Sequence, residues 1–267
     1  MRASTRLPPW ARSDVVGSIF VAATTLGGEA RIVGGAVRDW LAKRRVGDID
    51  MAVNLPIRVM ADELRQHQPI KVINTGLDHG TVTVVCGSDA VELTQTRSDD
   101  DTDGRHAVVR FQDDWVQDAA RRDLTINAIY LDAEGQIFDP LNGRADLAAR
   151  RLRFVGAAAD RVQEDALRML RYCRFSIDYS DGYYDVEAMD ALTSFAALTA
   201  RLSGERVAME LRKILTHAAC APAVGLLHQT GLDKASLGCD LLVTGVPLTP
   251  QDLRVVTADF GWLVLLA

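Results

Sequence analysis

The chain has 267 residues, of which 48% are apolar, so it is long enough to bury one large core or two smaller ones. Its net charge of −6 and pI near 5.4 exclude a uniformly basic nucleic-acid coat, although a local basic patch could still bind phosphate. The four cysteines are scattered without a C-x-x-C pair, which favours neither a zinc site nor a disulfide framework and fits a reducing compartment.

Neither end of the sequence predicts a membrane segment. The N-terminal MRASTRLPPWARSD lacks the apolar core of a signal peptide. The C-terminal FGWLVLLA is much shorter than the ~20 apolar residues that span a bilayer. We therefore expect a soluble, cytoplasmic protein without membrane partners.

Short apolar strands alternate with helices up to about residue 150. The pattern predicts strands over 30–33 and 48–53, helices over 36–45 and 56–67, and hairpins over 79–97 and 125–140. The acidic run SDDDTDG at 98–104 is typical of a solvated loop. Such mixing of strands and helices predicts an α/β or α+β domain over residues 1–150.

The second half of the sequence has helical periodicity instead. Apolar residues keep helical spacing over 161–175 and again over 203–218, where Ser203 is a candidate N-cap. We expect only helices over residues 151–267. The stretch 237–267 shows no clean period, so the structure of residues 225–267 is left open.

Two aspartates, Asp48 and Asp50, lie in the strand-like segment VGDIDMAVN at 46–54. Residues i and i+2 of a strand project to one face, where two carboxylates repel each other unless a positive group lies between them. An exposed strand end or an Asx turn after Gly47 is the simpler interpretation. Glu92, on a strand that could lie alongside, would add a third carboxylate, and three carboxylates near a phosphate site could hold two Mg²⁺ ions. An ordinary solvent-facing role for Glu92 is the alternative.

A glycine pair precedes these aspartates. Gly34 and Gly35 end a strand and open a helix, a junction at which backbone N–H groups can approach a phosphate closely.

Together, GGAVRD (34–39) and GDIDMAV (47–53) resemble the nucleotidyltransferase signature of the polymerase-β superfamily. The fuller pattern is similar to that of the class II CCA-adding tRNA nucleotidyltransferases and their poly(A) polymerase relatives. Five further blocks keep that family's order: HGTVTV (79–84), RRDLTINAIY (121–130), FDPLNGRADL (138–147), EDALRMLRYCRF (164–175) and GERVAMELRKIL (204–215). The resemblance covers roughly residues 30–220.

The resemblance implies an α+β fold: a polymerase-β-like nucleotidyltransferase head with a mixed sheet and flanking helices over 1–150, then an all-helical neck and shortened body over 151–267. It implies that Asp48, Asp50 and Glu92 are catalytic, with Asp48 and Asp50 as Mg²⁺ ligands. The implied nucleotide-binding residues are Gly34, Gly35, Arg38, Arg121, Arg122, Asp123, Asn127, Asp165, Arg168, Arg171 and Arg174. Supporting residues behind them would be Glu164, Glu205, Arg206 and Glu210.

Some of these residues have a plainer interpretation. Asn127 could serve a capped turn, Arg38 and Asp39 could pair with each other, and Glu205, Arg206 and Glu210 could form ordinary salt bridges. Leu124 replaces the phenylalanine usual in the family, a change that preserves packing. The segment 97–112 has the place of the family's flexible loop, and its Asp and Gly content favours mobility.

Asp165 and Arg168 can be tested on chemical grounds. At i and i+3 of a helix their side chains would be neighbours. A carboxylate accepts hydrogen bonds and a guanidinium only donates them. Cytosine and adenine present an amino donor beside a ring-nitrogen acceptor, whereas uracil and guanine present the reverse pattern, so the pair could select C and A without a template. The alternative is a surface ion pair worth only ~0.3–0.5 kcal/mol.

The sequence thus predicts a template-independent, Mg²⁺-dependent tRNA nucleotidyltransferase that adds C and A from CTP and ATP to the 3′ end of the acceptor stem. A poly(A) polymerase, or an enzyme adding only CC or only A, shares the same blocks. Family members usually continue well beyond this length, which motivates a third interpretation, an inactive RNA-binding remnant. A small-molecule adenylyltransferase would not need the Asp165 and Arg168 pair. Oligomeric state is left open.

Overall fold

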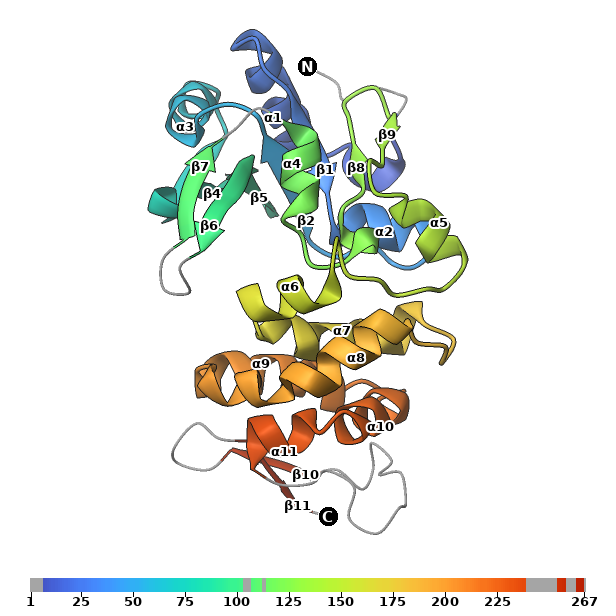
Figure 1. Cartoon of the computed structure of the whole chain (residues 1–267). Coiled ribbons are helices and arrows are strands. Elements are labelled where there is room, and N and C mark those ends of the chain that lie inside the picture. The colour runs from blue at the N-terminus through green and yellow to red at the C-terminus, as the bar shows by residue number, and fades with distance from the viewer. Residues whose placement is uncertain (1–6, 103–106, 112–113, 239–253, 258–262, 267) are drawn as a thin grey trace. The chain divides into compact units, whose positions relative to one another are not determined.

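The computed structural model describes residues 7–102, 107–111, 114–238, 254–257 and 263–266. The chain divides into two compact units, Met1–Ala145 and Asp146–Ala267 (Figure 1).

A seven-stranded mixed sheet organises the first unit, in the order β3-β4-β5-β2-β1-β8-β9. Its strands are β1 (Ala30–Val33), β2 (Ile49–Val53), β3 (Lys71–Gly76), β4 (Thr81–Cys86), β5 (Asp89–Gln95), β8 (Tyr130–Leu131) and β9 (Ile137–Phe138). Neighbouring strands run antiparallel except β2 and β5, which are parallel. The helices of this unit are α1 (Asp14–Thr25), α2 (Gly35–Leu41), α3 (Ile57–Arg65), α4 (Trp115–Ala120) and α5 (Gly143–Ala148), which crosses into the second unit.

The two faces of the sheet bury different sets of side chains. Ile32 and Met51 belong to the large core that includes residues of α1 and α3, whereas Val33 and Ala52, their neighbours along the strands, pack with Trp115 of α4. Since side chains alternate along a strand, Asp50 shares the α4 side with Ala52. Strand alternation therefore places Asp50 on the face of the sheet that packs against α4, where its side chain is exposed.

The predicted elements of this unit are present, with corrections at their ends. The helix predicted over 36–45 stops at Leu41, and Lys43 takes a positive φ of 57° that ends it. The strand predicted from Asp48 begins at Ile49, and residues Thr125–Asn127, predicted as strand, form a 3-10 turn.

The segment expected to be a loop, 97–112, contains β6 (Arg97–Thr102) and β7 (Ala107–Phe111), which pair antiparallel. Its β-branched AVV run explains the strand. The remainder of the predicted mobile loop lies outside the described residues.

Helices form the described core of the second unit. They are α6 (Ala158–Glu164), α7 (Leu167–Tyr179), α8 (Val186–Phe195), α9 (Gly204–Leu215), α10 (Ala221–Gln229) and α11 (Leu232–Leu237). Helix α7 contacts α9 and α10, and Phe154 stacks on Tyr172 with ring centroids 5.1 Å apart. The expectation of helices alone is wrong near the end, where β10 (Arg254–Thr257) and β11 (Leu263–Leu266) form a small antiparallel pair rich in Val and Leu.

The predicted class, a mixed sheet with flanking helices followed by a helical region, is confirmed. None of the described helices combines the length and apolarity that a membrane crossing requires. Cys86, Cys173 and Cys220 are free thiols. The cytoplasmic location stays a prediction.

Gly143 is the tightest backbone contact beside the 3-10 turn at 125–127. A Cβ there would lie 2.2 Å from the Thr125 carbonyl oxygen. We expect Gly143→Ala to lower the free energy of unfolding by about 1–3 kcal/mol, because backbone must shift. The control Gly225→Ala, in α10 with nothing within 4 Å, should be neutral or stabilise by up to about 1 kcal/mol. Urea unfolding measures both, and equal effects would contradict the prediction.

Candidate active site

Two carboxylates meet on the sheet because of one strand pairing. In the parallel ladder between β2 and β5, Asp50 is the direct partner of Glu92. Both side chains are exposed, and within the described residues neither makes a hydrogen bond or ion pair. Asp48 lies one residue before β2, so the expectation that it shares the strand with Asp50 is corrected.

The electrostatics of Asp50 reflect this crowding. Withdrawal from bulk water, followed by repulsion from Glu92, raises the pKa of Asp50 to about 6, and Asp48 contributes in the same direction. Arg122 acts against this rise. The side chain nevertheless stays open to solvent, so a cation can reach it. Loss of hydration and like-charge repulsion thus both oppose ionisation of Asp50.

This acidic pair fits a divalent ion that takes some of its ligands from the protein and the others from a substrate. In the described residues no group of three or more His, Cys, Asp or Glu side chains could hold a metal alone. Mg²⁺ is commonly bound by one or two carboxylates together with substrate phosphates and water. Asp50 and Glu92 offer that number of ligands, and the three-carboxylate centre with Asp48 stays a prediction.

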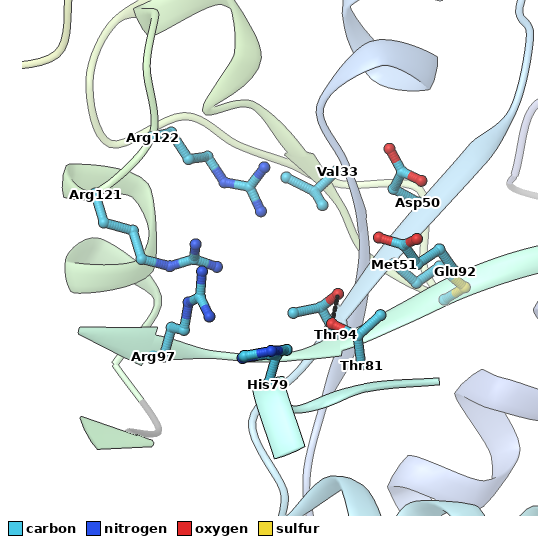
Figure 2. Close-up of a pocket in the computed structure, with 10 residues that line it drawn as sticks. All are labelled: Val33, Asp50, Met51, His79, Thr81, Glu92, Thr94, Arg97, Arg121 and Arg122. Carbon is cyan, nitrogen blue, oxygen red and sulfur yellow. Dashed lines mark hydrogen bonds between the residues drawn. The ribbon is translucent and has the colours of Figure 1, made fainter. Parts of the chain in front are cut away.

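A pocket of about 410 Å³ opens beside the carboxylates, and all of its lining belongs to the first unit. Figure 2 shows Asp50 and Glu92 on one side and the guanidinium groups of Arg97, Arg121 and Arg122 on the other. The remaining lining residues are Val33, Met51, His79, Thr81 and Thr94. A cavity with acid on one wall and cations on the other suits a metal-bound polyphosphate.

Asp118, on α4, holds the cationic wall in place. Its fully buried carboxylate accepts hydrogen bonds from Arg121 Nε at 2.9 Å, Arg122 Nη2 at 3.1 Å and the Tyr130 hydroxyl at 2.8 Å. Burial alone would raise the pKa of Asp118, but Arg122 and Arg121 outweigh it and lower the pKa. A charged, fully bonded carboxylate thus fixes two of the predicted phosphate-binding arginines.

Four predicted residues, Arg38, Asp39, Asp123 and Asn127, form a chain of largely buried contacts. Arg38 Nη1 donates to Asn127 Oδ1 at 2.6 Å, and Asn127 Nδ2 donates to Asp123 Oδ1 at 3.0 Å. Arg38 also pairs with Asp39 at 2.7 Å. Asp123 and Asn127 are 9% and 6% exposed, so their contacts here serve the framework, and direct contact with a nucleotide stays a prediction.

The junction at Gly34 and Gly35 has the expected backbone shape, but the Gly34 N–H is already engaged in a hydrogen bond within the protein. Gly34 has a φ of 73°, a conformation that favours glycine. Its N–H donates to the Ile129 carbonyl at 3.3 Å, and that bond ties β1 to the 121–130 block. Gly35 opens α2.

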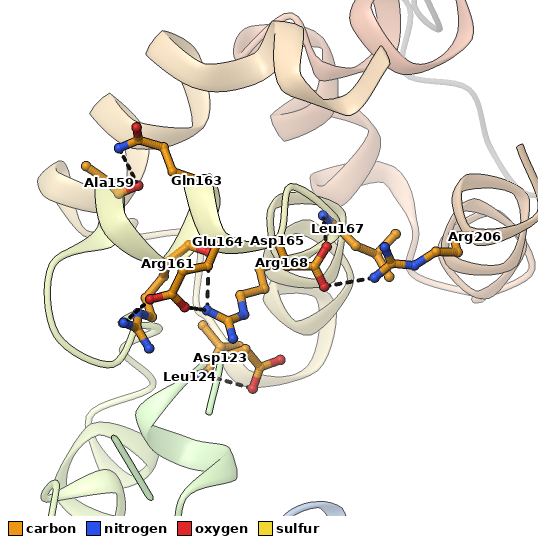
Figure 3. Close-up of polar contacts among 10 residues, drawn as sticks. All are labelled: Asp123, Leu124, Ala159, Arg161, Gln163, Glu164, Asp165, Leu167, Arg168 and Arg206. Carbon is orange, nitrogen blue, oxygen red and sulfur yellow. Dashed lines mark hydrogen bonds and ion pairs between the residues drawn. The ribbon is translucent and has the colours of Figure 1, made fainter. Parts of the chain in front are cut away.

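The predicted continuous helix over 161–175 is wrong at Asp165. Helix α6 ends before this residue, whose backbone is extended at φ −149° and ψ 104°. Its Oδ1 accepts the N–H of Leu167, the first residue of α7, at 3.1 Å, and that bond needs the extended backbone (Figure 3). Asp165 and Arg168 therefore do not share one helix.

Each member of this pair has its own partner. Arg206 of α9 donates to Asp165 Oδ2 at 2.8 Å, and Glu164 accepts from Arg168 Nη1 at 2.5 Å, as Figure 3 shows. Glu164 also pairs with Arg161. A carboxylate oxygen has two acceptor sites, so Asp165 can still accept a further donor.

The other predicted residues of the second unit make contacts of their own. Arg174 Nε donates to Glu210 Oε2 at 2.6 Å, and Lys213 Nζ lies 3.1 Å from Glu210 Oε1. Burial opposes ionisation of Glu210, but Arg174 and Lys213 together lower its pKa. Arg171 lies over the Phe175 ring at 5.3 Å, and Glu205 is exposed in the first turn of α9.

Sequence reasoning missed Asp118, Arg97 and His79 as parts of the site. Asp118 precedes Arg121 and Arg122 by three and four residues, the spacing of ion pairs on a helix, and that signal could have found it. His79 opens the block HGTVTV but has no spacing signal of its own. Arg97 follows β5 by two residues, and only the fold brings it to the pocket.

Comparisons with known families identify proteins that are similar to this chain. Residues 30–153 match the model of the poly A polymerase head domain, and residues 185–237 match that of the probable RNA and SrmB-binding site of polymerase A. The mouse mitochondrial CCA tRNA nucleotidyltransferase 1 is 44% identical over 76% of this chain and 48% of its own length. The CCA-adding enzyme of Geobacillus sp. (strain WCH70) is 41% identical over 77% of this chain and 50% of its own length. The chain spans about half the length of these relatives.

Solved structures are similar as well. The crystal structure of the Bacillus stearothermophilus CCA-adding enzyme in complex with CTP has a TM-score of 0.77 and 36% identity, over 87% of this chain and 55% of that one. A tRNA nucleotidyltransferase complexed with a primer tRNA and an incoming ATP analog has a TM-score of 0.70 at 23% identity, over 82% and 62%, which supports the fold alone.

Asp118→Asn should destabilise the first unit by about 3–5 kcal/mol, because it leaves two largely buried arginines without their counter-ion. The lowered pKa of Asp118 means that its stabilisation is present above pH ~4 and is lost as the pH falls further. Urea unfolding at pH 7 measures the effect. The control Asp114→Asn keeps the cap of α4 and should change little; a loss as large as that of Asp118→Asn would contradict the prediction.

Asp50→Asn should raise the melting temperature at pH 8 in EDTA. Because the folded pKa of Asp50 is raised to about 6, the folded state binds the proton more tightly, and its ionisation costs stability as the pH rises through that value. Below pH ~4 the gain should vanish. Added Mg²⁺ should stabilise the unmodified protein and not the variant. Asp89→Asn, an exposed carboxylate at the start of β5, is the control; a gain equal to that of Asp50→Asn would refute a site-specific effect.

Proposed function

We propose that this chain, which belongs to the tRNA nucleotidyltransferase and poly(A) polymerase family, carries the catalytic machinery of a template-independent CCA-adding enzyme. The observation that carries the proposal is the pocket in which Asp50 and Glu92 face Arg121 and Arg122. This arrangement matches the needs of nucleotide transfer, in which a polyphosphate must be held while one of its phosphorus atoms is attacked.

The proposed reaction joins a tRNA 3′ end to CTP or ATP. The terminal 3′-hydroxyl oxygen bonds to the α-phosphorus, the bond from that phosphorus to the bridging oxygen of the β-phosphate breaks, and pyrophosphate leaves. The hydroxyl proton passes to solvent. Arg121 and Arg122, held by Asp118, would bind the polyphosphate and stabilise charge that builds up on the leaving group.

Members of this family generally use divalent metal ions. We propose Mg²⁺ here, held by Asp50 and Glu92 with Asp48 in support. When bound, it would lower the pKa of the attacking hydroxyl and neutralise charge on the pyrophosphate.

Selection of the base is proposed for Asp165 and Arg168. The Asp165 carboxylate would accept the amino group of cytosine or adenine, and the Arg168 guanidinium would donate to the adjacent ring nitrogen. Support comes from the contacts that fix both groups, Arg206 on Asp165 and Glu164 on Arg168. Uracil and guanine would place a donor against Arg168 and an acceptor against Asp165, so both would be refused.

A primer-extension assay tests the function. We would supply Mg²⁺ and three tRNA transcripts, ending before CCA, after CC and after CCA, each with the four nucleotides separately and with CTP and ATP together. With both nucleotides we expect two C and then one A on the first transcript. Separately, only ATP should extend the second, and none should extend the third. Asp50→Asn should lower the rate at least a hundredfold, because it removes a proposed metal ligand.

Other outcomes reassign the protein. Unlimited A addition would indicate a poly(A) polymerase, and addition of only CC or only A would indicate a partial enzyme. RNA binding without any extension, unchanged in Asp50→Asn, would indicate a binding protein and overturn the proposal.

A further inference from the structure

His79 is a pocket residue to which the proposed reaction has so far given no role. It ends the 3-10 turn Leu77–His79, and Gly80 follows it with a φ of 75°. The Gly80 N–H donates to the Leu77 carbonyl at 3.1 Å, and the Gly80 carbonyl accepts from Gln95 N–H at 2.8 Å. This turn is thus tied to the end of β5, and the backbone of His79 has a fixed position beside the pocket.

Two adjacent residues of this turn, Asp78 and His79, point in different directions. Asp78 is almost fully exposed and lies 3.4 Å from Arg58 on the surface. His79 instead lines the pocket with Arg97 and Thr81 (Figure 2). Within the described residues its imidazole makes no hydrogen bond or ion pair, although the side chain is exposed to the cavity.

The two walls of the pocket indicate which part of a bound nucleotide would lie near His79. The reacting α-phosphate must lie near the proposed metal ligands Asp50 and Glu92, because the metal would act on the attacking oxygen. The β- and γ-phosphates then extend toward the cationic wall that contains Arg97, Arg121 and Arg122. An imidazole on that wall has a nitrogen-bound hydrogen available in either protonation state, and phosphate oxygens are acceptors.

We propose that His79 donates a hydrogen bond to the β- or γ-phosphate of the bound nucleotide and keeps it on the departing pyrophosphate. The inference rests on the proposed function and adds a specific contact on the leaving-group side. His79 thereby acts on the affinity for the triphosphate and its pyrophosphate product, and it makes no contact with the base or the α-phosphate.

The test compares binding of inorganic pyrophosphate with MgCl₂ to the full chain and three variants by titration calorimetry. We expect His79→Ala to weaken pyrophosphate binding about tenfold, as loss of one charge-assisted hydrogen bond predicts. His79→Gln, whose amide can still donate, should recover to within about threefold of the unmodified chain. His67→Ala removes an imidazole paired with Glu63 outside the pocket and should leave binding unchanged.

A second ligand locates the contact. CMP lacks the β- and γ-phosphates, so its inhibition of primer extension should be the same for the unmodified chain and His79→Ala, while the KM for CTP rises in the variant. A merely structural role would weaken CMP and pyrophosphate alike, and that result would overturn the inference.

The inference and the proposed function can fail separately. Pyrophosphate binding that is weakened about tenfold in His79→Ala and largely recovered in His79→Gln would support the contact even if no tRNA were extended. Unchanged pyrophosphate affinity in a folded His79→Ala variant would overturn it even if extension proceeds as expected. Absence of pyrophosphate binding to the unmodified chain would overturn it too.

Discussion

The parallel pairing of β2 with β5 is the constraint on which the site depends. It sets Asp50 directly opposite Glu92, and like charges in that position destabilise a sheet. The register is held from the other face, where Met51 and Leu93 are 1% and 0% exposed. A slip of one residue would bury the carboxylates and expose this core. Burial of the apolar face therefore keeps Asp50 and Glu92 paired, although the two carboxylates repel each other.

The opposite wall of the pocket depends on a different kind of interaction. Asp118 is completely buried, yet its charge is satisfied by Arg121, Arg122 and Tyr130. One carboxylate thus orients two guanidinium groups and leaves them a net positive charge toward the cavity. Acid on one side and cations on the other make the pocket suited to an anion that carries a metal.

In the second unit, local hydrogen bonding overrides helical periodicity. The apolar spacing over 161–175 continues through Asp165 without a break, so the sequence predicts one helix. The Asp165 side chain instead accepts the Leu167 N–H and begins a new helix, and Arg206, 41 residues later, fixes its second oxygen. A short polar side chain that competes for backbone N–H groups is a known reason for such a break.

The sequence by itself determined the fold class, the strands and helices that carry the glycine and aspartate motifs, and most of the acidic and basic residues of the pocket, because periodicity and motif spacing are local properties. Only the tertiary structure decided which of those residues meet. It paired Asp50 with Glu92, gave the Gly34 N–H to Ile129, and brought His79 and Arg97 into one pocket. These contacts depend on strand register and on packing between segments far apart in the chain, which no local pattern encodes.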